Sequence, residues 1–297
     1  MEFFYAKDVK NKEVFDYDLH KKAAQAIALA SANGEPCFLL SFGIPGTGKS
    51  EFPYNLAYNM NHGMNTPFSL MYAKCDELLR RIISGDASVA NVTHVLESKI
   101  KLAFQNTPSI VAFDEIDSFT AAISGSDTIA STLTRWMRGY AKEAPPRTLT
   151  IGTTNWPIAM DFSVTRRVRA HLFFDVTPND VICKILLQQL GIQNCEAIGN
   201  AVIEQLNEDH VVPVASDIVY ACEELKKRVP DPAKLPEGEL CDDLVALTSG
   251  TQMESIDEYC TKYEGLINRA KKQVNYWARE FDKIKASIQN ISGGDSS

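Results

Sequence analysis

Short apolar runs alternate with helical patterns through the first 176 residues. Five of these runs are bounded by polar or turn residues, as buried strands usually are: Cys37–Phe42, Phe68–Ala73, Ile110–Phe113, Leu149–Thr153 and His171–Val176. Strands that alternate with helices form a parallel sheet with helices on both faces. The pattern therefore predicts an α/β fold for residues 1–176, with a parallel sheet inside a three-layer sandwich.

The strand pattern stops after Val176 and helical spacing replaces it. Thr177–Asp180 reads Thr-Pro-Asn-Asp, which is typical of a helix start, and apolar residues at helical spacing follow over Val181–Leu190. A further helix is predicted from about Ala215 to Arg228. Residues 177–229 are therefore predicted to form a small helical lid, and the proline-rich stretch that follows indicates a linker over 230–250.

The final long segment, residues 251–290, has the most regular pattern in the chain. Apolar side chains recur at spacings of three and four: Met253, Ile256, Cys260, Tyr263, Ile267, Ala270, Val274, Trp277, Phe281, Ile284 and Ile288. This a/d pattern predicts an amphipathic heptad helix. The helix could form a coiled coil with another chain, or it could pack on its own lid. The tail, residues 291–297, is expected to be disordered.

Composition narrows the class of protein. The chain has 297 residues, a formal net charge of -8 and seven scattered cysteines. We expect reduced thiols in a cytoplasmic protein, with neither a disulfide framework nor a zinc site. The acidic balance argues against a nucleic-acid partner. No apolar run approaches 18 residues, so the sequence predicts no membrane span.

The clearest chemical motif follows the first predicted strand. Residues 43–50 read Gly-Ile-Pro-Gly-Thr-Gly-Lys-Ser, which matches the phosphate-binding pattern G-x-x-x-x-G-K-[ST] between a strand and a helix. We predict that the backbone amides of this loop bind the phosphates of ATP. Lys49 would reach the β- and γ-phosphates, and the Ser50 hydroxyl would bind Mg²⁺. The candidate nucleotide-binding residues are Gly43, Ile44, Pro45, Gly46, Thr47, Gly48, Lys49 and Ser50.

Two later strands end in further polar residues. The strand that begins at Ile110 runs into Asp114 and Glu115. Asp114 is a candidate nucleotide- and Mg²⁺-binding residue, because a carboxylate at a strand end can hold the ion's ligand shell. Glu115 is a candidate general base for the attacking water. After the next strand, Asn155 could orient that water or contact the γ-phosphate, or it could simply form a turn.

A basic cluster follows at Thr165–Arg169, which holds three arginines in four residues. Such a cluster can be a solvated turn. It can also supply an arginine finger to the γ-phosphate held by a neighbouring subunit. The motif alone does not distinguish which arginine would point at the phosphate.

Together these motifs resemble the AAA ATPases of the AAA+ superfamily, in the subgroup that includes katanin, spastin and the N-ethylmaleimide-sensitive factor. The resemblance covers roughly residues 20–229. It implies that Gly43–Ser50 is the Walker A motif, that Asp114 and Glu115 form Walker B, and that Asn155 is sensor 1.

The same resemblance implies an assembly and its fingers. In the family, two arginines follow a conserved aspartate by five and eight positions, and Arg166 and Arg169 stand at those distances from Asp161. We therefore expect a homo-oligomeric ring, usually a hexamer, with ATP sites between subunits. The family's first pore loop carries an aromatic residue, where this chain has Ile82 and Ile83.

Three functions remain open from the sequence. The first is an ATP-hydrolysing ring, dependent on ATP and Mg²⁺, that remodels a protein or protein complex. The second is an ATP-dependent assembly switch without peptide threading, as in a mobile-element or anti-phage system. The third is a nucleic-acid motor or loader, which the acidic composition disfavours. The first reading predicts a protein substrate or partner.

Overall fold

The structure is a computed structural model that describes residues 1–10, 18–34, 37–64, 66–120 and 128–293. The chain forms two compact units. The larger contains residues 1–42, 49–173 and the chain from 268 onward, and the smaller contains residues 43–48 and 174–267.

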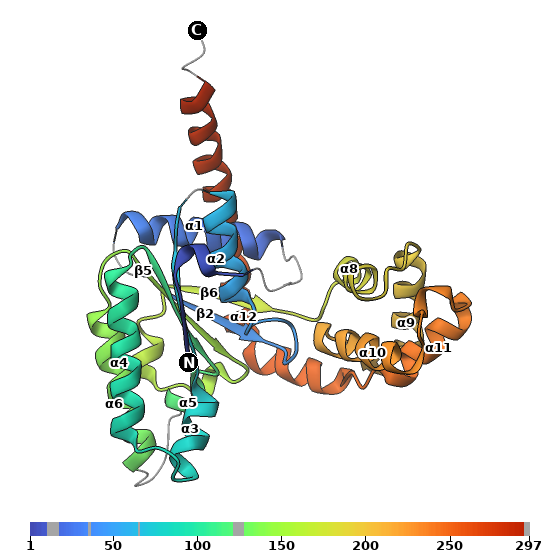
Figure 1. The fold of residues 1–297 in the computed structure, drawn as a ribbon, viewed down its shortest axis with the longest axis horizontal. Coiled ribbons are helices and arrows are strands. Elements are labelled where there is room, and N and C mark those ends of the chain that lie inside the picture. The colour runs from blue at the N-terminus through green and yellow to red at the C-terminus, as the bar shows by residue number, and fades with distance from the viewer. Residues whose placement is uncertain (11–17, 35–36, 65, 121–127, 294–297) are drawn as a thin grey trace. The chain divides into compact units, whose positions relative to one another are not determined.

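The larger unit is built around a six-stranded sheet of order β1-β3-β4-β5-β2-β6 (Figure 1). The strands are β1 Glu2–Phe4, β2 Cys37–Gly43, β3 Ser69–Lys74, β4 Ser109–Asp114, β5 Thr148–Thr154 and β6 Ala170–Phe174. β3 and β4, β4 and β5, and β5 and β2 pair in parallel. The five predicted strands are confirmed. β1 was not predicted, and it pairs with β3 in antiparallel orientation.

Helices cover both faces of this sheet, as predicted (Figure 1). α4 contacts β3 and β4 on one face, while α1 contacts β5 and α2 contacts β3 and β4. Successive side chains of a strand point to opposite faces. Val111 and Phe113 of β4 accordingly belong to the cluster that packs under α4 and α6. The elements of this unit are η1 Ala6–Asp8, α1 Asp18–Asn33, α2 Phe52–Gly63, α3 Cys75–Ile83, α4 Val89–Gln105, α5 Asp117–Thr120, α6 Thr128–Glu143, η2 Pro157–Ala159 and α7 Phe162–Thr165.

The smaller unit is mostly helical. α8 packs on α9 and α10, and α11 packs on the same two helices. The prediction was correct for α10 and nearly so for α8, but it missed α9 and α11. The segment 230–250 is not a plain linker, because α11 buries Leu240 and Leu244 within this unit. The elements are α8 Asn179–Leu190, α9 Cys195–Glu208, β7 Val211–Val212, α10 Ala215–Arg228, η3 Pro232–Lys234, α11 Glu237–Leu247 and β8 Thr251–Gln252.

The predicted heptad segment is one helix, α12, which runs from Met253 to Gly293. Its first residues belong to the smaller unit, and from Asn268 onward it belongs to the larger. Four predicted heptad positions are only half-buried: Met253, Cys260, Trp277 and Ile284. Tyr259 and Ala278 are buried in place of Cys260 and Trp277, and the side chain of Ile288 lies outside the described part of the chain. The buried side chains of α12 are Ile256, Tyr259, Tyr263, Ile267, Ala270, Val274, Ala278 and Phe281. Other parts of the same chain cover them.

Two further sequence predictions concern the C-terminal tail and the absence of a membrane span. The predicted disordered tail, 291–297, begins inside α12, and residues 294–297 lie outside the described part of the chain. Among the helices of the described residues, α12 included, none combines the length and apolarity that crossing a membrane requires.

Candidate active site

The loop after β2 has a shape that only glycine accommodates at two positions. Gly43 has φ +145° and Gly46 has φ +76°. A Cβ on Gly43 would lie 2.0 Å from the Phe174 carbonyl oxygen, and one on Gly46 would lie 2.3 Å from Ser216 Oγ. Both residues therefore need the conformational freedom of glycine and its missing side chain. The backbone of the loop fits a phosphate cradle of the kind that the motif predicts.

Hydrogen bonds hold the same loop in place within the smaller unit. The Ile44 amide donates to the Phe174 carbonyl over 3.0 Å, and the Ser216 amide donates to the Gly46 carbonyl over 3.0 Å. The buried Thr47 hydroxyl donates to the Ile44 carbonyl over 2.7 Å. The first contact uses a loop amide, and the other two use the loop carbonyls of Gly46 and Ile44. Together they fix the shape of the loop.

Asp114 ends β4 as a buried carboxylate whose two oxygens both accept hydrogen bonds. Tyr72 of β3 donates its hydroxyl to Oδ2 over 2.7 Å, and Thr153 of β5 donates its hydroxyl to Oδ1 over 2.5 Å. The neighbouring strands therefore fix the orientation of this side chain. Such support around a carboxylate ligand is common in metal sites, so the donor set fits the Mg²⁺ role predicted for Asp114.

Glu115 follows with a strained backbone. Its φ is +50°, in the left-handed region that non-glycine residues rarely adopt. Thr153 holds this turn from both sides: its hydroxyl accepts from the Glu115 amide over 3.1 Å, and its carbonyl accepts from the Ile116 amide over 2.9 Å. Burial raises the pKa of the Glu115 carboxyl, and the nearby carboxylates of Asp76 and Asp114 raise it further.

Lys49 lies directly after the glycine loop, in the turn that leads to α2, and its side chain is 6% exposed. Burial lowers the pKa of its ammonium group to about 7, although the carboxylates of Asp114 and Glu115 act in the opposite direction. Lys49, Asp114 and Glu115 are therefore close enough to interact electrostatically. Ser50 follows Lys49 in the same turn and is half-buried.

Asn155 follows β5 directly and so lies at the same end of the sheet as Asp114. Its Oδ1 is buried, and no described residue supplies it with a hydrogen bond. A buried polar atom without a partner costs free energy, so its retention suits a side chain that contacts a ligand or an ordered water. This fits the role predicted for Asn155 better than a simple turn does.

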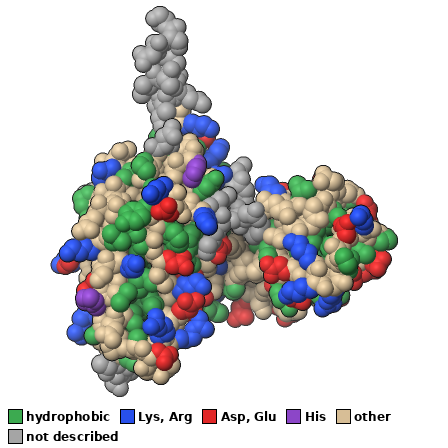
Figure 2. All heavy atoms as spheres, in the orientation of Figure 1, with side chains coloured by type: hydrophobic (Ala, Val, Ile, Leu, Met, Phe, Trp, Pro, Cys, Tyr) green, Lys and Arg blue, Asp and Glu red, His purple; other side chains and the backbone are tan. Residues whose placement is uncertain are grey.

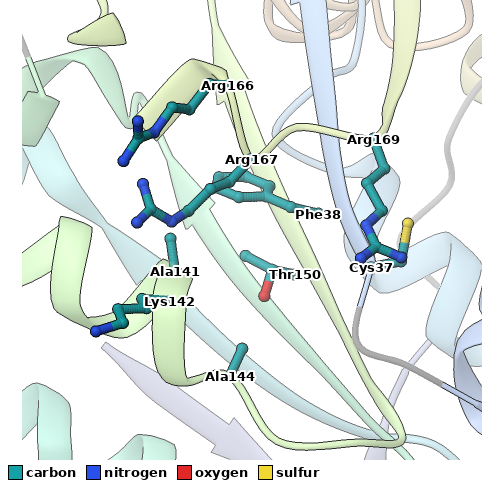
Figure 3. Close-up of a pocket in the computed structure, with 9 residues that line it drawn as sticks. All are labelled: Cys37, Phe38, Ala141, Lys142, Ala144, Thr150, Arg166, Arg167 and Arg169. Atoms are coloured by element: carbon teal, nitrogen blue, oxygen red, sulfur yellow. The ribbon is translucent and has the colours of Figure 1, made fainter. Parts of the chain in front are cut away.

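The arginine cluster lines a pocket of about 300 Å³ between β2, β5 and the end of α6 (Figure 3). The guanidinium groups of Arg166 and Arg167 lie side by side, whereas Arg169 points toward Cys37. Lys142 of α6 also lines the pocket. The sequence paired Arg166 with Arg169, but the side chains pair Arg166 with Arg167. The sequence left open which arginine of the cluster would point at a phosphate and did not include Lys142, because side-chain direction depends on packing.

The segment that carries these arginines is anchored at its start. Asp161 caps α7 by accepting from the Ser163 amide over 2.8 Å, and it also forms an ion pair with Arg138 over 2.7 Å. Arg167 donates to the Ser163 carbonyl. At the far end, the Arg169 amide donates to the Phe38 carbonyl of β2 over 2.9 Å.

Sequence analysis also missed Tyr72 and Thr153. Each stands near the end of a predicted strand, so the only available signal was a polar group next to the end of the sheet that carries Asp114. Which strands are neighbours decides the contact, and the sequence does not give strand order.

Comparison with known proteins identifies a family match over the sheet and these motifs. A model described as "ATPase family associated with various cellular activities (AAA)" matches residues 39–176. Vacuolar protein sorting-associated protein 4B of Pongo abelii is 29% identical over 140 residues, which cover 46% of this chain and 29% of that protein. Vacuolar protein sorting-associated protein 4A of Homo sapiens is 26% identical over 158 residues, 52% of this chain and 33% of that protein. The matches therefore span about a third of these relatives.

Two solved structures share the fold. The crystal structure of the FIGL-1 AAA domain superposes with a TM-score of 0.62 at 19% identity, over 86% of this chain and 90% of that one. The same domain in complex with ADP gives a TM-score of 0.63 at 19% identity, over 86% and 91% of the two chains. At 19% identity this likeness shows a shared fold and no more.

Proposed function

We propose that the chain binds ATP with Mg²⁺ and hydrolyses it to ADP and phosphate, because a model of the AAA family of ATPases matches residues 39–176. The loop Gly43–Ser50 and Lys49 bind the phosphates, and Ser50 and Asp114 hold the ion. Mg²⁺ held there would offset the negative charge that develops on the phosphate oxygens. Asn155 contacts the γ-phosphate or the attacking water.

Glu115 is the proposed general base. The observation that carries this proposal is the pair Asp114–Glu115, in which a carboxylate fixed by two hydrogen bonds precedes an acid in a strained backbone conformation. Strain of this kind is concentrated at functional sites. Burial and neighbouring carboxylates raise the pKa of Glu115, which favours uptake of a proton from water.

The arginines are proposed to act on a second copy of the chain. Arg169 is bonded to Phe38, which pairs with Thr150, whereas Asp114 is bonded to Thr153, three residues further along β5. Three residues of strand span roughly 10 Å. The side chains of Arg166 and Arg167 also turn toward α6 (Figure 3). They therefore face away from Asp114 of their own chain, and a neighbour's γ-phosphate is the anion they would meet.

Two exposed apolar side chains, close in sequence to the arginines, support assembly. Phe162 is 77% exposed and Ile158 is 67% exposed. The Arg166 amide donates to the Phe162 carbonyl over 3.0 Å, so Arg166 and Phe162 belong to one helical turn. A subunit that receives Arg166 would also cover Phe162, removing it from water. We propose a homo-oligomeric ring, with six subunits as the family resemblance implies.

The proposed substrate is a protein or protein complex, as the names of the vacuolar protein sorting relatives suggest for those proteins. Ile83 is 70% exposed and could contact a polypeptide, while Ile82 is buried. Ile83 offers an aliphatic side chain where the family carries an aromatic one, so an assembly switch without threading remains the second candidate function. On the face drawn in Figure 2, charges of both signs are interspersed among the described side chains, which offers duplex DNA no broad basic surface.

The test mixes two inactive variants. Glu115→Gln has a defective site but intact arginines, and the double variant Arg166→Ala/Arg167→Ala has an intact site but no fingers. Each should turn over ATP ~10²-fold or more slowly than the parent chain. Mixed assemblies place intact sites beside intact arginines, so activity should reappear. Arg169→Ala is the matched control: it retains Arg166 and Arg167, so it should stay active on its own and gain little from mixing. If assembly is verified by light scattering and the mixture stays inactive, the trans role is wrong.

A further inference from the structure

β6 is the last strand of the sheet, so one edge of it has no strand neighbour. Edge strands expose amide and carbonyl groups that need other partners. At this edge the carboxamide of Gln273, on α12, supplies both. Its Nε2 donates to the Arg169 carbonyl over 3.2 Å, and its Oε1 accepts from the His171 amide over 2.9 Å.

These two bonds reproduce what a parallel neighbour strand would make. In a parallel ladder, one residue donates to the carbonyl before its partner and accepts from the amide after it. Here Arg169 and His171 flank Ala170 in that way, and the side chain of Gln273 takes the place of a peptide group. His171 Nδ1 lies 3.2 Å from the same Gln273 oxygen, which adds a third contact.

Other contacts fix α12 along this edge. Lys271 Nζ lies 5.8 Å from the centre of the Phe173 ring, and Lys22 of α1 forms a 3.3 Å ion pair with Asp282. Val274 and Ala278 are buried beside these residues on the same helix. The position of Gln273 is therefore set by the packing of the helix in the larger unit, and its amide has little freedom to leave the edge.

The Arg169 carbonyl is the point at which the arginine segment enters the sheet. Its amide is bonded to Phe38 and its carbonyl to Gln273, so both polar groups of this peptide stretch are held. We propose that Gln273 is a positioning residue, which holds the entry of β6 so that Arg166 and Arg167 are presented to a neighbouring subunit. The inference rests on the proposed trans role of these arginines.

The experiment compares Gln273→Leu with the matched control Asn275→Leu, an exposed position two residues away. Leu keeps approximate size and helix propensity but forms neither bond. We expect ATP turnover to fall ~10-fold or more, within the ~10³-fold or greater loss that full removal of fingers gives. ATP affinity should not change, because Gln273 touches none of the proposed nucleotide ligands. Gln273→Glu keeps the acceptor but cannot donate to Arg169, and it should show the same loss of turnover.

Two readouts separate positioning from general damage. Subunits carrying Glu115→Gln should restore activity when mixed with Gln273→Leu, because they lend intact arginines to its intact site. Amide hydrogen exchange at His171 should quicken ~10-fold or more as the part-buried bond is lost, and the control should leave exchange unchanged.

Unchanged turnover in Gln273→Leu, or lost turnover that Glu115→Gln subunits do not restore, would overturn the proposal. If the Arg166→Ala/Arg167→Ala variant also failed to complement, the trans role itself would be at fault. Hydrogen exchange would then still report whether Gln273 holds the segment. Unaltered exchange at His171 would refute that as well.

Discussion

Thr153→Val removes one hydroxyl from the centre of the candidate site while keeping the shape of the side chain. That hydroxyl donates to Asp114 over 2.5 Å and accepts from the Glu115 amide over 3.1 Å. Thr153 is fully buried, so water cannot replace the lost groups without rearrangement. The substitution therefore tests whether β5 fixes the two acids as described.

The expected loss follows from the two bonds. A hydrogen bond to a charged group contributes about 1.5–3 kcal/mol and one between neutral groups about 0.5–1.5 kcal/mol. Val fills the space of Thr, so no cavity adds to this cost. The free energy of unfolding should fall by about 2–4 kcal/mol. Because a hydrogen bond that orients a metal-binding side chain is commonly worth ~10–100-fold in metal affinity, the Mg²⁺-dependent part of ATP binding should weaken by at least ~10-fold.

Stability is measured by urea unfolding without nucleotide, and ATP affinity by calorimetry with and without Mg²⁺. Thr150→Val is the matched control on the same strand. Its hydroxyl contacts the buried Tyr140 hydroxyl over 2.8 Å, away from the acids. This control should lose about 1–3 kcal/mol of stability but retain the Mg²⁺ dependence of ATP binding.

Either of two results would show that Thr153 does not fix the two acids. If Thr153→Val unfolded within ~0.5 kcal/mol of the parent chain, the hydroxyl would not be making the bonds described. If its Mg²⁺-dependent affinity matched that of Thr150→Val, the orientation of Asp114 would not depend on β5.

Three further predictions concern Lys49, Phe162 and Glu115. With the pKa of Lys49 lowered to about 7, the free chain carries a neutral amine above that pH, whereas phosphate favours the ammonium. ATP binding should therefore be accompanied by proton uptake near pH 8, and ATP affinity should fall as pH rises from about 7 toward the ordinary lysine pKa of about 10. Calorimetry in buffers of different ionisation heat should detect the proton uptake, and its absence would contradict the prediction. Phe162→Ser should raise the concentration needed for assembly in light scattering without altering ATP affinity in the monomer, whereas exposed Tyr276→Ser, the control, should not. Glu115→Gln should slow turnover ~10²-fold or more yet unfold at higher urea near neutral pH, because it removes a part-buried charge beside other carboxylates; lower stability would count against this account.

The strands were predictable because each central strand is a continuous apolar run. β1 was not, since Glu2–Phe4 is too short to form such a run. α11 was missed because nearby prolines suggested a linker, although Pro236 stands at the N-cap, where proline is compatible with a helix start. In α12 a strict heptad drifts against 3.6 residues per turn, which moves the buried stripe to Tyr259 and Ala278.

The candidate site divides in a similar way. The glycine loop and the acids after β4 are contiguous motifs, so their residue types and spacing were enough to predict them. The contact between Thr153 and Asp114 joins residues 39 positions apart, and it depends on strand order. The pairing of Arg166 with Arg167 depends on which way each side chain turns from one short segment (Figure 3). Sequence spacing carries neither kind of information.

Glu115 is held in its position at a cost to the fold. Its backbone is left-handed, its carboxyl is part-buried, and Asp76 and Asp114 repel its negative charge. Backbone strain of this kind costs about 1–3 kcal/mol and persists only where the surroundings over-determine it. Thr153 supplies that constraint, through its hydroxyl at the Glu115 amide and its carbonyl at the next amide. An acid that merely ended a strand would relax toward solvent, where neither the strain nor the repulsion would arise. The cost is therefore explained if the carboxylate must stand at a fixed place beside Asp114, which is the requirement for activating a water at a metal-bound phosphate.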